Sequence, residues 1–163
     1  MPADENDGRR SEDVLALVRR IGRLKASGRD VAILPFDPRD LRCYQRGTCE
    51  AAMAHVLRRA HDAFPHGRIV IVTGNVHAMR LRPDNAPEGF PKQPMTALLR
   101  DLKPYSVNVT AERGAYWACR DTCGIVDVAP SRSGGREGAG SPFNYRLVLP
   151  VFTPIRQVGE SRE

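Results

Sequence analysis

The chain has 163 residues, of which 41% are hydrophobic and 27% are charged, a composition typical of one soluble globular domain. Its formal net charge is +6, but the arginines are scattered over expected helix faces and only 6% of the residues are aromatic, which argues against nucleic-acid binding. No stretch approaches the roughly 18 apolar residues of a membrane-spanning helix.

Helices and strands are expected to alternate over the first two thirds of the chain, because apolar residues recur first at helical spacing and then in short continuous runs. A disordered tail at 1–10 is followed by a helix that Ser11 caps and Gly28 ends, a strand at 31–36, a helix at 49–64 and a strand at 68–73. A proline-rich loop at 81–94 then leads to a helix at 95–102 and a strand at 105–111. The chain continues with a short β element at 115–119, a flexible segment at 131–142 and a last β element at 145–152.

This order predicts an α/β fold with a mainly parallel sheet, helices on its faces and extra β elements toward the C-terminus. Because a helix connects them, the strands at 31–36 and 68–73 are expected to run parallel in one sheet. We expect a single α/β domain over residues 11–156, followed by a tail at 157–163.

Polar side chains follow both expected strands. Asp37 comes directly after the first strand, and Gly74, Asn75 and His77 follow the second. Ligands in such folds bind beyond the carboxyl ends of the strands, so these residues are candidates for a site. Glu50 lies on the apolar face of its expected helix, where a carboxylate needs a partner such as His77 or a metal ion. The alternative is that Glu50 only stabilises the start of that helix through the helix dipole.

These motifs, taken in order, resemble the C-terminal half of the Tiki superfamily, which includes erythromycin esterases, ChaN-like haem-uptake proteins and TraB-type proteins. The resemblance covers residues 12–80 and rests on a strand aspartate, an acidic helix motif and a histidine motif, here Asp37, then Glu50 with Met53 and Ala54, then Gly74, Asn75 and His77. Cys49 stands where the family usually has arginine, and the family's upstream G-E-X-H motif is absent. We therefore expect either part of a larger Tiki-like domain or a member with a degenerate site.

The resemblance implies a metal-dependent hydrolase, or a remnant of one, acting on a small-molecule or peptide ligand. Glu50 and His77 would be catalytic, and Asp37, Glu50 and His77 would hold a divalent metal ion. The alternative is a non-catalytic ChaN-like domain that binds haem or a metal, with Tyr44 and His77 as the ligand-binding residues. Whether the chain is an enzyme is left open by its single histidine motif.

The four cysteines form two close pairs, Cys43 with Cys49 and Cys119 with Cys123. Neither spacing is the CX2C of zinc ribbons, so disulfides and free thiols are both favoured over zinc. The polar N-terminus lacks the apolar region of a signal peptide, which favours cytoplasmic localisation for the chain as it stands. If it belongs to a longer exported or periplasmic precursor, each pair is expected to form a disulfide that holds a loop near the site.

Overall fold

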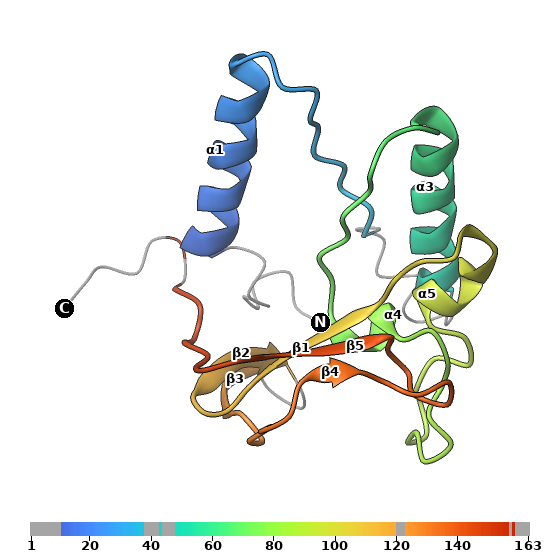
Figure 1. Ribbon diagram of the computed structural model, residues 1–163, viewed down its shortest axis with the longest axis vertical. Coiled ribbons are helices and arrows are strands. Elements are labelled where there is room, and N and C mark those ends of the chain that lie inside the picture. Colours follow the sequence, from blue (N-terminus) through green and yellow to red (C-terminus); the bar gives the residue numbers. More distant parts are fainter. Residues whose placement is uncertain (1–10, 38–42, 44–47, 120–122, 157, 159–163) are drawn as a thin grey trace. The chain divides into compact units, whose positions relative to one another are not determined.

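The protein was analysed as a computed structural model, which describes residues 11–37, 43, 48–119, 123–156 and 158 (Figure 1). The chain divides into two compact units, each assembled from separate segments. The first unit comprises Met1–Leu34, Thr110–Arg132 and Val148–Glu163, and the second comprises Pro35–Val109 and Ser133–Leu147. The tail expected at 1–10 and the tail expected at 157–163, except Val158, lie outside the described residues, and the single domain expected over 11–156 stays a prediction.

Helix α1, Glu12–Ala26, belongs to the first unit and begins where the sequence predicts. The hydroxyl oxygen of the buried residue Ser11 accepts a hydrogen bond from the N–H of Val14 at 3.2 Å, which satisfies one of the unpaired donors of the first turn. Gly28, with a φ of +84°, ends the helix in a conformation that glycine adopts without strain. The apolar side chains Val14 and Leu17 stay 44% and 48% exposed, so this helix does not bury its face.

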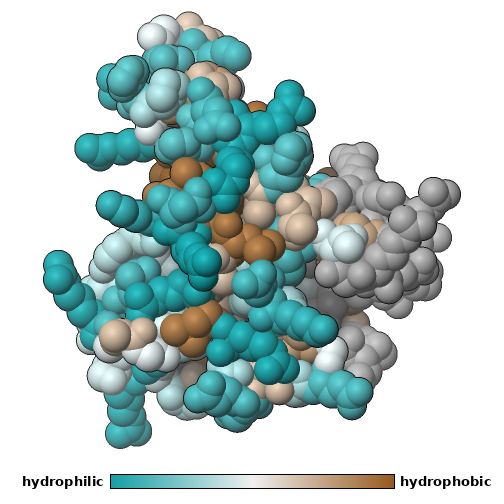
Figure 2. Space-filling view, turned by 90° about the vertical axis from the view of Figure 1, so that its right-hand side faces the viewer, coloured by the Kyte–Doolittle hydropathy of each residue, from teal (hydrophilic) through white to brown (hydrophobic). Residues whose placement is uncertain are grey.

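The segments 31–36 and 68–73 are irregular and belong to no sheet, so the prediction of two parallel central strands is wrong. Within the described chain, residues 68–73 form no backbone hydrogen bond, and Val70 and Val72 are 86% and 76% exposed. Runs of β-branched residues favour an extended backbone, but a strand also requires a neighbouring strand to pair with its N–H and C=O groups. Figure 2 shows apolar side chains, in brown, open at the surface.

The sheets are small and lie in the C-terminal half of the chain. One has three strands in the order β1-β5-β4, with bounds Val107–Ala111, Tyr145–Leu149 and Gly135–Arg136. The other is an antiparallel hairpin of β2, Ala115–Cys119, and β3, Cys123–Asp127. The predicted mainly parallel sheet with helices on its faces is therefore wrong, whereas strands do form within 105–111, 115–119 and 145–152.

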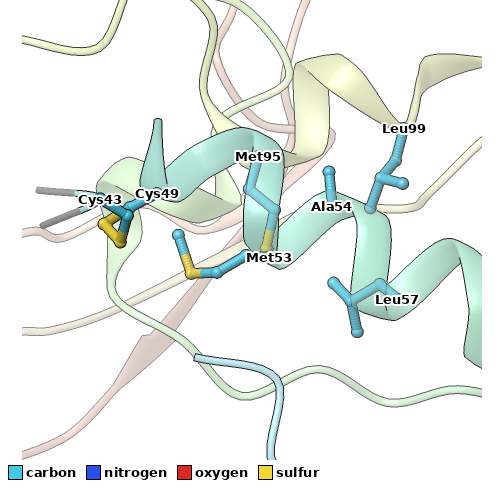
Figure 3. Packing of buried hydrophobic residues seen from close by; sticks show 7 residues of the cluster. All are labelled: Cys43, Cys49, Met53, Ala54, Leu57, Met95 and Leu99. Atoms are coloured by element: carbon cyan, nitrogen blue, oxygen red, sulfur yellow. A yellow bond between two sulfur atoms is a disulfide. The ribbon is translucent and has the colours of Figure 1, made fainter. Parts of the chain in front are cut away.

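The main core lies in the second unit, around α3, Cys49–Ala63. Helix α3 packs against the short helix α5, Met95–Leu98, which continues into the 3-10 helix η1, Arg100–Leu102. Figure 3 shows the side chains that fill this contact, which are all less than 10% exposed: Cys43, Cys49, Met53, Ala54, Leu57, Met95 and Leu99. The sequence predicts a core face of Met53, Val56, Leu57, Ala60 and Phe64 for this helix. Met53 and Leu57 are buried as predicted, whereas Phe64 is 58% exposed.

An ion pair joins the outer side of α3 to η1. Arg58 Nη1 donates to Asp101 Oδ2 at 2.5 Å, and Arg58 Nη2 donates to the carbonyl of Leu98 at 3.1 Å. The hydrogen bond from Arg58 lowers the pKa of Asp101 to about 2. In the described segments, no helix combines the length and the apolar content needed to cross a membrane.

Candidate functional site

Glu50 and His77, which the sequence places 27 residues apart, are in direct contact. The Nδ1 atom of His77 lies 2.6 Å from Oε1 of Glu50. Glu50 is the second residue of α3, and His77 is the third residue of the short helix α4, Asn75–Ala78. The contact brings the acidic helix motif and the histidine motif together within the second unit.

The second oxygen of Glu50 is also bound. Oε2 accepts a hydrogen bond from the backbone N–H of Met95, the first residue of α5, at 2.6 Å. The Glu50 side chain is only 10% exposed, and an unpaired carboxylate at such a position would be costly. Donors on both oxygens offset that cost, and hydrogen bonds to an ionised group are stronger than those between neutral groups. Glu50 is therefore a buried acceptor fixed between α4 and α5.

Helix α4 is held by side chains that the sequence motifs did not include. Thr96 Oγ1 donates to the carbonyl oxygen of His77 at 3.0 Å, and the Ser106 hydroxyl donates to the carbonyl oxygen of Ala78. The Met95 N–H that binds Glu50 was missed as well, because a backbone donor has no side-chain signature. The only sequence signal near it is the proline-rich loop at 81–94, which leads directly into α5.

The contact defines which nitrogen of His77 carries the proton. An ionised carboxylate only accepts hydrogen bonds, so Nδ1 of His77 must be the donor and Nε2 of the neutral ring keeps its lone pair. Within the described segments, Nε2 has no hydrogen-bond partner. The His77 side chain is 26% exposed, so a water molecule or a small ligand can reach it. A carboxylate-oriented imidazole of this kind can accept a proton or bind a metal ion.

The metal ligands expected from the sequence do not form one group. Asp37 is described and half-buried, but no cluster of three or more His, Cys, Asp or Glu side chains suited to a metal ion occurs in the part of the chain that the structure describes. Both oxygens of Glu50 are already bound to protein donors. Both carboxylate oxygens are therefore taken up within the protein, whereas Nε2 of His77 has no partner among the described residues, and the metal site stays a prediction. Tyr44, the other haem-ligand candidate, lies outside the described residues.

A disulfide supports the start of α3 next to Glu50. Cys43 and Cys49 are bonded to each other, with their Cα atoms 4.7 Å apart. Thr48 also donates its N–H to the carbonyl oxygen of Cys43 at 2.8 Å. This is the pairing expected for an exported protein, and it fixes the backbone that carries Glu50.

The second cysteine pair lies in the β2–β3 hairpin. Cys119 and Cys123 are directly opposite each other in its register. Cys123 is disulfide-bonded, whereas the side chain of Cys119 lies outside the part that the structure describes. The hairpin belongs to the first unit, and Glu50 and His77 belong to the second.

Comparison with known proteins identifies no relative: no protein-family model, no curated protein and no solved structure matches this chain.

Proposed function

We propose that this chain is a hydrolase in which Glu50 orients His77 and His77 acts as the general base. The observation that carries the proposal is the 2.6 Å contact between Glu50 Oε1 and His77 Nδ1, made by a buried carboxylate beside a partly exposed imidazole. The resemblance of the three motifs to the Tiki superfamily supports the same reaction class, which is hydrolysis of an ester or amide. A degenerate remnant of such an enzyme would keep the contact without the activity.

The reaction begins with a water molecule hydrogen-bonded to Nε2 of His77. Nε2 takes a proton from this water as its oxygen attacks the carbonyl carbon of the substrate. The imidazolium that forms is stabilised by the negative charge of Glu50 through Nδ1–H, as in other carboxylate–histidine pairs. The same Nε2–H then protonates the leaving alcohol or amine, which returns His77 to its neutral form. General-base catalysis of this kind contributes about 10²- to 10⁴-fold in rate.

A panel of activated esters tests the proposal directly. Purified protein is assayed with p-nitrophenyl acetate and butyrate from pH 5 to 9, together with His77→Ala and Glu50→Gln. The matched control is His55→Ala, which removes an exposed histidine from α3. We expect His77→Ala and Glu50→Gln to lose at least 100-fold in kcat/KM and the control to stay within twofold of the parent. Equal rates for His77→Ala and the parent would refute the proposal.

A second candidate function, binding of haem or a metal ion without catalysis, rests on the same free nitrogen. Histidines that bind metal usually donate their other ring N–H to a carboxylate, which is the orientation of His77. Metal analysis of the native protein and titration with haem, followed by Soret absorption, distinguish the two functions. Stoichiometric binding that is lost in His77→Ala, with no esterase activity in the parent, would favour binding over hydrolysis.

A further inference from the structure

A pocket lies at the hairpin formed by β4 and β5, in the second unit (orange in Figure 1). It is a depression of about 460 Å³ that is wide open to solvent. Three glycines and two serines line it together with Arg136, Glu137 and Arg146. The sequence suggested only a flexible segment here, at 131–142, whereas the structure forms a strand at Gly135–Arg136.

Arg80 holds the loop that connects the two strands. Its Nε atom donates to the carbonyl oxygen of Ser141 at 2.9 Å, and its Nη2 atom donates to the carbonyl oxygens of Gly138 and Ala139 at 2.9 and 2.8 Å. All three acceptors are neutral carbonyl groups. In the described part of the chain no carboxylate pairs with Arg80, so its positive charge stays uncompensated at the base of the loop.

The side chains that line the pocket carry further positive charge. Arg146 Nη2 lies 2.8 Å from Glu137 Oε1, and the Ser141 hydroxyl donates to Glu137 Oε2. The carboxylate of Glu137, whose side chain is 12% exposed, is thus paired in charge with Arg146 and bonded to Ser141, although its buried Oε1 accepts no hydrogen bond within the described residues. Arg136 is exposed and has no partner among the residues that the structure describes. Around the loop, the three guanidinium groups of Arg80, Arg136 and Arg146 therefore carry two more positive charges than the single carboxylate of Glu137 balances.

The backbone at the pocket is open to a ligand. Gly135 has a φ of +139°, and no atom lies within 4 Å of the place where a Cβ atom would stand at Gly135 or at Gly138. Without side chains at these positions, a ligand can approach the backbone closely. The donors that suit phosphate oxygens here are the guanidinium groups.

We propose that this pocket binds a small molecule through a phosphate group, with Arg136 as the main contact and with added positive charge from Arg80, which holds the loop but does not line the pocket. The excess of two positive charges matches a phosphate dianion better than a single carboxylate. The pocket is larger than inorganic phosphate needs, so the ligand is a phosphorylated small molecule. The inference does not depend on the Glu50–His77 pair, because no residue of that pair lines the pocket.

The test is an NMR titration of the full chain with inorganic phosphate and with glycerol 3-phosphate, against sodium chloride at equal ionic strength. We expect saturable amide shifts confined to residues 133–146, with glycerol 3-phosphate binding more tightly than phosphate. Arg136→Ala should weaken binding at least tenfold. Arg59→Ala, which removes an exposed arginine of α3 outside the pocket, should change it less than twofold.

Three results would overturn the inference. One is shifts no larger than those caused by chloride, and another is equal weakening by Arg136→Ala and Arg59→Ala. The third is tighter binding of a single-stranded oligonucleotide than of either small anion, with shifts beyond the pocket, which would assign the charge to nucleic-acid binding instead. Because Arg136 is exposed, its replacement is not expected to unfold the chain.

Discussion

Replacing Glu50 by alanine should destabilise the protein, because it removes the acceptor of a buried backbone donor. Met95 is 0% exposed, so its N–H would be left without a partner at a cost of about 1 to 3 kcal/mol. The Nδ1–H of His77 would lose its partner too, but this ring is 26% exposed and water can replace the carboxylate at little cost. We expect a loss of about 2 to 3 kcal/mol in the free energy of unfolding.

The assay is urea denaturation followed by circular dichroism at 222 nm, which monitors the helices. With a slope of about 2 kcal/mol per molar urea, the midpoint should fall by about 1 to 1.5 M. Glu50→Gln is the matched control, because its amide oxygen can still accept from the Met95 N–H, and it should cost less than about 1 kcal/mol. Equal midpoints for the Ala and Gln variants would refute the reasoning, since the buried donor would then not need its acceptor.

Met53→Ala should lower the free energy of unfolding by about 2 to 5 kcal/mol in the same assay, because the Met53 side chain is only 1% exposed. Val70→Thr is the control and should change it by less than about 0.5 kcal/mol, because Val70 is 86% exposed. The bond between Cys43 and Cys49 closes a loop with a sequence separation of 6, so replacing both by serine should cost about 2 kcal/mol. The hydrogen bond from Arg58 lowers the pKa of Asp101 to about 2. The ionised carboxylate therefore stabilises the folded state above pH 3.8, the pKa in the unfolded chain, and this stabilisation is lost as the pH falls toward 2. The parent should therefore lose more stability than Asp101→Asn between pH 4 and pH 2, and equal losses in urea midpoints would contradict this.

The sequence predicted the buried face of α3 and the C-terminal strands correctly, but it was wrong about the central parallel sheet, and the apolar face of α1 is exposed. The apolar spacing of Met53 and Leu57 predicted the buried side of α3, since one helix can show its own periodicity. The apolar runs at 31–36 and 68–73 predicted two strands, but composition cannot show whether a neighbouring strand exists. Val70 is the clearest failure, because a residue read as buried in a sheet is 86% exposed.

The candidate site was predictable in part for a similar reason. Glu50 lies on an apolar helix face, and a buried carboxylate requires a donor, which led to His77. The second donor, the N–H of Met95, could not be predicted, because every residue except proline carries one. Asp37 was included because it follows an expected strand, and without that strand the argument that brought it to the same edge no longer holds.

The central claim is that Glu50 holds His77 as the tautomer protonated on Nδ1, with Nε2 free to take a proton. A long-range ¹H–¹⁵N correlation spectrum of the neutral imidazole measures this directly, because it distinguishes the protonated from the bare ring nitrogen. We predict a protonated Nδ1 and a bare Nε2 in the parent. In Glu50→Gln the amide can donate to the ring instead, so the proton should move to Nε2. A proton on Nε2 of His77 in the parent protein would contradict the account.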